Sequence, residues 1–207
     1  MSTIRPVYPK NSHPDAQKWN GIFQREGDAW LNRRPRQLLL DYVKMLPRRG
    51  LALDAAAGVA IHGRYLARYG LHVIALDISE VGLRLARQQA RTEGVWLEAA
   101  VYDLAHPWFP PNCFDVILNF RFLERATFAT YRQALKPGGW LLFETFIKTD
   151  AAAPTPAHYL NPGELKAAFA DWQIIHYADA IAPAPGCHQR RVAQLVARKP
   201  GPANRKQ

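Results

Sequence analysis

The first half of the chain contains three short apolar runs that each end in an aspartate. The runs are residues 51–54, 72–77 and 95–103, and they end at Asp54, Asp77 and Asp103. Helical segments separate them, and short apolar runs that alternate with helices are typical of parallel strands covered on both faces. Because ligands of open α/β sheets bind beyond the carboxyl ends of the strands, the three aspartates predict a ligand site at that edge.

The same alternation continues and then changes near residue 147. Further strands are expected at 114–120 and 140–146, and helices at 35–46, 61–70 and 79–94 and from residue 124 up to Pro137 and the two glycines that close it. The segments 172–182 and 190–199 are expected to be strands that pair antiparallel, because no helix fits between them. The sequence therefore predicts an α/β fold, a Rossmann-like three-layer sandwich with a seven-stranded, mostly parallel sheet and an antiparallel last strand.

The length of 207 residues suits one domain, which we expect at 49–200. Residues 1–48 are expected to form an N-terminal arm and helices that could serve as a lid, and residues 201–207 a basic, disordered tail. No apolar run approaches the length of a membrane span, and the first residues do not resemble a secretory signal. Cys113 and Cys187 have no metal-ligand spacing, so a cytoplasmic protein without a metal site is expected.

The formal net charge of +10 is concentrated at the two ends of the chain. Residues 190–207, for example, contain six Lys/Arg and no acidic residue. Basic ends can attract RNA, but they also simply solubilise a chain, which is the preferred interpretation. No RNA-binding module or strip of stacking aromatic residues accompanies the charge. RNA is therefore a possible partner that is not favoured over a small molecule, and no oligomeric state follows from the sequence.

The segment 53–70, LDAAAGVAIHGRYLARYG, resembles the first loop of a nucleotide-binding fold but has one central glycine, Gly58. It has no adjacent Lys or Ser/Thr, so it is not a Walker loop, and the three-glycine NAD fingerprint is also absent. Asp77 follows Gly58 by 19 residues, the distance at which an acid meets ribose hydroxyls. Asp103 could accept from an amine such as adenine N6. Asp54 could organise the loop or attract a cation such as a sulfonium with an α-ammonium group.

The motifs LDxxxGxxxH, VIALDIS, Asp103-Leu104, FDVIL and LKPGG resemble those of the class I S-adenosylmethionine-dependent methyltransferases. More narrowly, the chain is similar to the small bacterial methyltransferases of the tellurite-resistance and thiopurine-methylating type, from about Trp19 to Lys199. The resemblance implies S-adenosylmethionine as cofactor, with the Gly58 loop at the methionine part and Asp77 at the ribose. It implies a site made of Asp54, Ala56, Gly58, Asp77, Ile78, Asp103, Leu104, Asn119 and Phe120.

Two positions depart from the family pattern Asp-x-Gly-x-Gly-x-Gly, because Ala56 and Ala60 replace the outer glycines. If their φ angles are positive, each alanine costs roughly 1–2 kcal/mol. If the angles are negative, only the bulk of the methyl group near the cofactor remains. We expect the cofactor to bind in either case, and a Gly58→Val substitution to abolish binding.

Transfer of a methyl group from a sulfonium is an in-line displacement that mainly requires alignment, and a base only if the acceptor arrives protonated. The weak candidates for a base are Glu144 and His62, and the catalytic residue stays unknown. Asn119 is followed by Phe-Arg-Phe rather than by the Pro-Pro-aromatic signature of amide and amine methylation.

Substrate contacts are expected from Trp19, Arg121 and Tyr159. Structural alternatives are a polar residue at a helix start for His62, an ion pair or an exposed helix start for Arg121, a surface loop for Tyr159, and packing of the first helix for Trp19. The leading hypothesis is a small-molecule methyltransferase. The alternatives are an RNA methyltransferase and a non-catalytic relative that binds S-adenosylmethionine, and an NAD-dependent oxidoreductase is the most distant.

Overall fold

The computed structural model describes residues 13–148, 158–182 and 190–201. Three predictions fall wholly or largely outside these residues. They are most of the N-terminal arm, the connection 183–189 between the last two predicted strands, and most of the basic tail 201–207.

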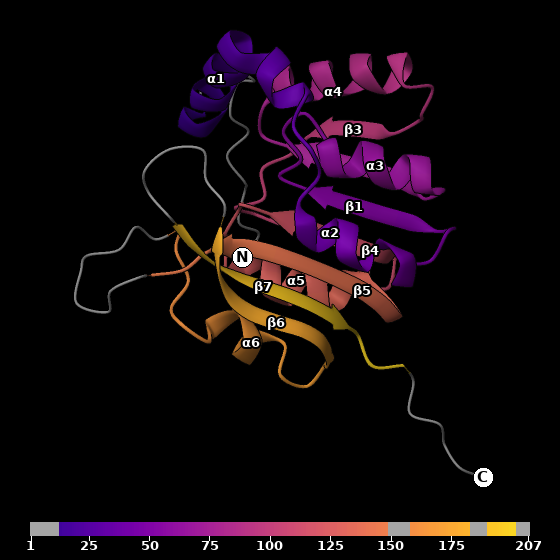
Figure 1. Ribbon diagram of the computed structural model, residues 1–207, viewed down its shortest axis with the longest axis vertical. Helices are drawn as coiled ribbons and strands as arrows, with labels where there is room; N and C mark the ends of the chain where they lie inside the picture. Colours follow the sequence, from indigo (N-terminus) through magenta and orange to yellow (C-terminus); the bar gives the residue numbers. More distant parts are fainter. Residues whose placement is uncertain (1–12, 149–157, 183–189, 202–207) are drawn as a thin grey trace, which may run out of the picture.

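The core is one seven-stranded sheet in the order β3-β2-β1-β4-β5-β7-β6 (Figure 1). The strands are β1 (Leu51–Ala55), β2 (His72–Asp77), β3 (Glu98–Val101), β4 (Phe114–Phe120), β5 (Leu135–Phe146), β6 (Gln173–Ala182) and β7 (Arg190–Arg198). Strands β1 to β5 are parallel, whereas β7 runs antiparallel between β5 and β6. The predicted fold is confirmed, including the terminal antiparallel hairpin.

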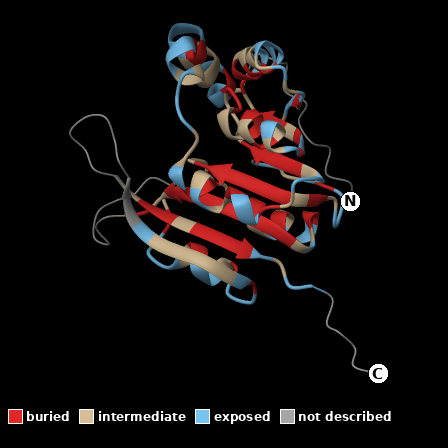
Figure 2. Cartoon of the chain, turned by 45° about the vertical axis from the view of Figure 1, so that its right-hand side comes forward, coloured by how far each residue is buried: buried red, intermediate tan, exposed pale blue. Residues whose placement is uncertain are grey.

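Helices cover both faces of the sheet and form three layers. They are α1 (Pro14–Leu31), α2 (Gln37–Tyr42), α3 (Ile61–Tyr69), α4 (Glu80–Thr92), α5 (Ala126–Ala134) and α6 (Glu164–Ala168). The apolar residues of α2, α3 and α4 share one buried cluster with one face, and those of α5 and α6 share a second cluster with the other. The central strands β1, β4 and β5 are the most buried part of the molecule (Figure 2). Within the described residues, no helix has both the length and the apolar character to cross a membrane.

Three predicted boundaries are wrong. The strand predicted at 95–103 is only four residues long, because Glu98–Val101 alone pair with β2. The helix predicted to continue up to Pro137 ends at Ala134, because the backbone of Leu135 already pairs with Phe114. The helix predicted at 35–46 divides into α2 and a short 3-10 turn, Val43–Met45.

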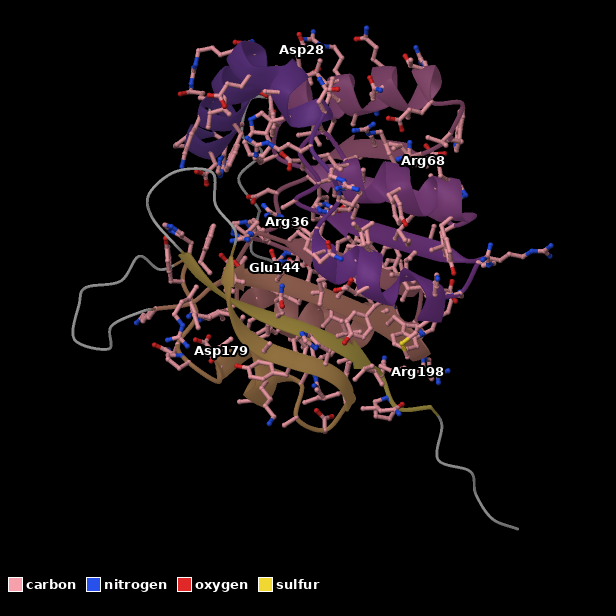
Figure 3. The ribbon with its side chains drawn as sticks, in the orientation of Figure 1. Asp28, Arg36, Arg68, Glu144, Asp179 and Arg198 are labelled. Carbon is pink, nitrogen blue, oxygen red and sulfur yellow. The ribbon has the colours of Figure 1, made fainter. Side chains whose placement is uncertain are left out.

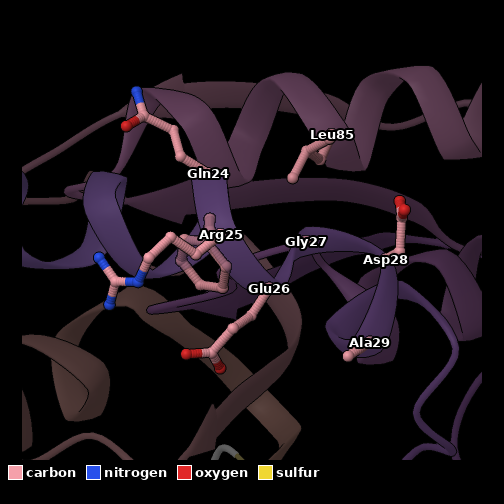
Figure 4. Close-up of a pocket in the computed structure, with 8 residues that line it drawn as sticks. Gln24, Arg25, Glu26, Gly27, Asp28, Ala29 and Leu85 are labelled. Atoms are coloured by element: carbon pink, nitrogen blue, oxygen red, sulfur yellow. The ribbon is translucent and has the colours of Figure 1, made fainter.

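Helix α1 lies beside α4 at the edge of the molecule (Figures 1 and 2). Two glycines allow this close approach. A Cβ atom on Gly27 would lie 2.7 Å from Leu85 Cδ1, and one on Gly82 would lie 2.9 Å from Phe23 Cδ2. A hollow of about 420 Å³ between the two helices is lined by Phe23 to Ala29 and Leu85 (Figure 4). Because its lining comes from α1 and α4 alone, it is not the site predicted at the strand ends.

Candidate functional site

The loop between β1 and α3 has three alternate residues in the left-handed region. The φ angles are 52° at Ala56, 55° at Gly58 and 50° at Ala60. The question left open by the sequence is thereby answered, because both alanines adopt the conformation that glycine favours. A left-handed conformation costs an L-residue roughly 1–2 kcal/mol. The two alanines therefore adopt a backbone conformation that is unfavourable for them.

Gly58 is held from two sides. Its backbone N–H donates to Asp77 Oδ2 at 2.7 Å. On its other side a Cβ atom would lie 2.9 Å from Phe23 Cζ, so the ring of Phe23 covers the loop. The neighbour Gly82 meets the same ring, and it also lies close to the carbonyl of Gly58. A side chain at Gly58 would therefore meet both steric and conformational resistance.

The Asp77 carboxylate ends β2 and is fixed by backbone donors. Oδ2 accepts from Gly58 N, and Oδ1 accepts from Ser79 N at 2.7 Å. Burial raises the pKa of Asp77 above its usual value, and the N–H groups of Ser79, Gly58 and Ile78 oppose that rise. The carboxylate is thus oriented before any ligand arrives, and each oxygen retains a further lone pair with which to accept.

Asp54 lies near the end of the neighbouring strand β1 and is 1% exposed. Its Oδ2 accepts from Gly63 N, in the first turn of α3, at 2.8 Å. Burial raises its pKa to about 7, and the nearby charge of Asp77 adds to the rise, whereas the Gly63 N–H and Arg64 lower it. A buried carboxyl group that titrates near neutrality would ionise more readily beside a bound cation.

The third aspartate follows the same edge. Asp103 lies two residues beyond β3, and the N–H of the preceding Tyr102 donates to the carbonyl of Asp77 at 2.9 Å. The Asp103 carboxylate accepts from Ala105 N at 2.9 Å and lies 3.2 Å from His106 Nδ1. Its side chain is 30% exposed and remains open to a ligand, while Leu104 beside it is buried. The three predicted aspartates therefore share one edge of the sheet.

His62, in the first turn of α3, contacts the end of β4. The imidazole of His62 stacks on Phe120, with ring centroids 4.3 Å apart. Burial, and then the charge of Arg36, lowers the pKa of His62 well below its usual range, so the ring is neutral at pH 7. Asn119 is fully buried, and its amide donates to Phe122 O at 2.8 Å and accepts from the Tyr131 hydroxyl at 3.0 Å.

Glu144 is buried at the end of β5 and is held by cations. Its Oε1 lies 3.0 Å from Arg121 Nε and 3.8 Å from Arg36 Nε (Figure 3 labels Glu144 and Arg36). Gln194 Nε2 donates to the other oxygen at 2.7 Å. Two guanidinium groups and an amide N–H thus face this carboxylate and hold it at the end of β5.

The predicted substrate residues divide into two groups. Arg121 has a φ of 61°, and its guanidinium lies 4.6 Å from the ring centroid of Phe146, which in turn stacks on Tyr159 at 5.4 Å. Through Arg121 these side chains form one cluster with Glu144. Trp19 instead lies on α1, where its ring stacks on Phe23 at 5.8 Å.

Sequence reasoning missed two residues of this site. Arg36 precedes α2 and joins the Glu144 cluster, but nothing in the sequence separates it from Arg33 and Arg34. Asn20 on α1 accepts from Ser79 and Val81 at the start of α4. Its spacing of three residues from Phe23, on one face of a helix, is the signal that could have found it.

This sheet order, with aspartates along its carboxyl edge, defines the fold of the class I S-adenosylmethionine-dependent methyltransferases. Residues 52–139 match the family model described as a methyltransferase domain. The resemblance to class I methyltransferases that the sequence predicts is thereby confirmed over residues 52–139.

Curated relatives match parts of the chain. The glycine/sarcosine/dimethylglycine N-methyltransferase of Actinopolyspora halophila is 32% identical over 147 residues, covering 64% of this chain and 25% of that protein. The ubiquinone biosynthesis O-methyltransferase of Nitrosococcus oceani is 33% identical over 108 residues, covering 48% of this chain and 45% of that protein. The chain thus spans between a quarter and about half the length of these two relatives.

Solved structures share the fold at low identity. TehB from Haemophilus influenzae superposes with a TM-score of 0.73 at 20% identity, covering 87% of this chain and 67% of that one. The cyclase SpnF superposes with a TM-score of 0.75 at 17% identity, covering 95% and 98%. Since one of these neighbours is named as a cyclase, the fold alone does not define the reaction.

Proposed function

We propose that the chain transfers a methyl group from S-adenosylmethionine to a small-molecule acceptor by in-line displacement. The observation that carries the proposal is the carboxylate of Asp77. It is oriented by the N–H groups of Gly58 and Ser79, beside the left-handed loop and within the matched methyltransferase domain. A fixed acceptor at the end of β2 suits a pair of ribose hydroxyls, because each carboxylate oxygen can accept one more hydrogen bond.

The remaining polar groups at this edge suit the other parts of the cofactor. Asp103 and Leu104 would take the adenine, with Ile78 beside the ribose. The left-handed loop would approach the methionine part, where the buried Asp54 offers a carboxylate to the α-ammonium group. Arg36 adjoins His62 at the start of α3, and it would supply the cation that the methionine carboxylate requires. Asp54 would thus face the positive charge of this amino-acid moiety, and Arg36 its negative charge.

The sulfonium supplies an already activated methyl group, so the chain has mainly to orient the acceptor and exclude water. The neutral ring of His62 can lie beside a cationic donor without repelling it. Glu144 is held by Arg121 and Arg36. We therefore assign it to shaping the part of the site that receives the acceptor, rather than to proton abstraction. The acceptor would therefore react as an anion or as a free amine, neither of which needs a strong base.

Binding and catalysis are tested separately. Calorimetry with S-adenosylmethionine, S-adenosylhomocysteine and NAD should show binding of the two adenosyl ligands only. A labelled-methyl screen should then include thiols, chalcogen oxyanions, phenols and amines, since two named relatives are N- and O-methyltransferases. Absence of adenosyl binding would overturn the proposal. Binding without transfer to any acceptor class would favour a non-catalytic relative.

A further inference from the structure

We propose that Asn20 of helix α1 is a positioning residue for the ribose-binding carboxylate and acts on Asp77 through Ser79. The inference rests on the proposed function, because it assigns the ribose contact to Asp77. It goes beyond that function by making the first helix a working part of the cofactor site. A residue on α1 would then determine how well the ligand binds at the end of β2.

The first link joins α1 to the start of α4. Asn20 Oδ1 accepts from the Ser79 hydroxyl at 2.7 Å and from Val81 N at 3.1 Å. Ser79 is fully buried and is the N-cap residue of α4, where its Oγ accepts from Gly82 N at 3.1 Å. The hydroxyl thus donates to Asn20 and accepts from α4, which fixes its rotamer.

The second link joins Ser79 to the cofactor loop. Ser79 N donates to Asp77 Oδ1 and Gly58 N donates to Asp77 Oδ2, each at 2.7 Å. An unbroken series of hydrogen bonds therefore runs from Asn20 through Ser79 and Asp77 to Gly58. Because both oxygens of Asp77 are tied to this series, a shift of Ser79 would turn the carboxylate that receives the ribose.

Asn20 and Phe23 perform separable tasks on the same helix. Phe23 fills the space over Gly58 and Gly82, so it supplies the apolar contact between α1 and the loop. Asn20 is only partly buried, and its two hydrogen bonds to Ser79 and Val81 use its carbonyl oxygen alone. An aspartate at this position keeps that acceptor, whereas a leucine keeps the size and removes it. The pair of substitutions therefore isolates the hydrogen bond from the packing.

The test compares S-adenosylhomocysteine with its 2′-deoxy analogue by calorimetry in the full chain. Asn20→Leu should weaken the binding of S-adenosylhomocysteine roughly tenfold. This loss is in the range expected when a hydrogen bond between a ribose hydroxyl and the charged Asp77 is impaired. It should also reduce the preference for the ribose over the deoxyribose ligand. Asn20→Asp should retain both properties. Gln24→Leu, an exposed change on the same helix, is the matched control and should behave as wild type.

Two results would overturn the inference. One is an unchanged preference for the ribose ligand in Asn20→Leu. The other is an equal loss for both ligands with an equally lowered melting temperature in Asn20→Leu and Asn20→Asp, which would show a packing role only.

If wild type binds neither ligand, the proposed function fails, and amide hydrogen exchange then tests the relay without a ligand. Asn20→Leu should accelerate exchange at Ser79 and Gly58 relative to wild type at an unchanged melting temperature. Unchanged exchange rates would overturn the relay itself.

Discussion

Replacing Ala56 with glycine should stabilise the chain, which is unusual for a change that removes a methyl group. With a φ of 52°, Ala56 adopts a conformation that costs an L-residue roughly 1–2 kcal/mol. Glycine removes this strain but restores freedom to the unfolded chain, which costs about 0.4–1 kcal/mol. The Ala56 side chain is only partly buried, so little packing is lost. The net gain should be about 0.5 kcal/mol.

The same reasoning ranks two neighbouring alanines. Ala60 is also left-handed, but it is fully buried in the core, and losing its methyl group costs about 0.8 kcal/mol. Ala60→Gly should therefore be close to neutral. Ala57 does not have a positive φ angle, so Ala57→Gly relieves no backbone strain. It should lower the free energy of unfolding by about 0.4–1 kcal/mol. It is the matched control within the same loop.

Thermal unfolding of the three variants measures this ranking. For a chain of this size 1 kcal/mol shifts the melting temperature by about 2–4 °C. Ala56→Gly should melt a degree or so above wild type and Ala57→Gly a few degrees below it, with Ala60→Gly between them. Equal destabilisation by Ala56→Gly and Ala57→Gly would refute the argument from backbone strain. Binding of S-adenosylhomocysteine should persist in Ala56→Gly and Ala60→Gly.

Three further outcomes are expected. The Asp54 pKa of about 7 lies above its unfolded value of 3.8, so the folded state binds more protons between them. This group's contribution to the free energy of unfolding should fall as pH rises from about 4 to 7, and Asp54→Asn should remove that fall in pH-dependent melts. Because a bound cation favours the ionised carboxyl, affinity for S-adenosylmethionine should rise through pH 7 in wild type only. Gly58→Val should lower the melting temperature and abolish binding, and Phe23→Leu should partly restore stability by making room; no restoration would contradict the contact between them. Arg121→Met should destabilise by a few kcal/mol in denaturant melts, because it leaves Glu144 short of a buried partner, and Glu144→Gln in addition should recover part of the loss.

The sequence predicted the parts of the fold that depend on local pattern. Short apolar runs ending at Asp54 and Asp77 predicted two strands and the sheet edge at which both aspartates lie, because hydrophobic periodicity and chain order determine both. The end of α5 was misjudged because the pairing of Leu135 with Phe114 is a tertiary contact that outweighs the helical pattern. The same distinction between local pattern and tertiary contact applies to the candidate site. The aspartates could be predicted from the strand ends, but Arg36 could not be distinguished from the other arginines of its segment.

The structure also explains how a loop with two left-handed alanines can keep its shape. Buried Arg64 donates to the carbonyl of Val59 in the loop and to that of Leu31 at the end of α1, and it pairs with Glu93 at the end of α4. Together with the cover of Phe23 over Gly58, these contacts hold the loop against α1, α3 and α4 at once. Strain of a few kcal/mol can persist only where surrounding contacts over-determine the backbone. We therefore attribute the tolerance of alanine at the outer glycine positions to the contacts of α1 and Arg64. These contacts specify the turn, so glycine is not required at either position.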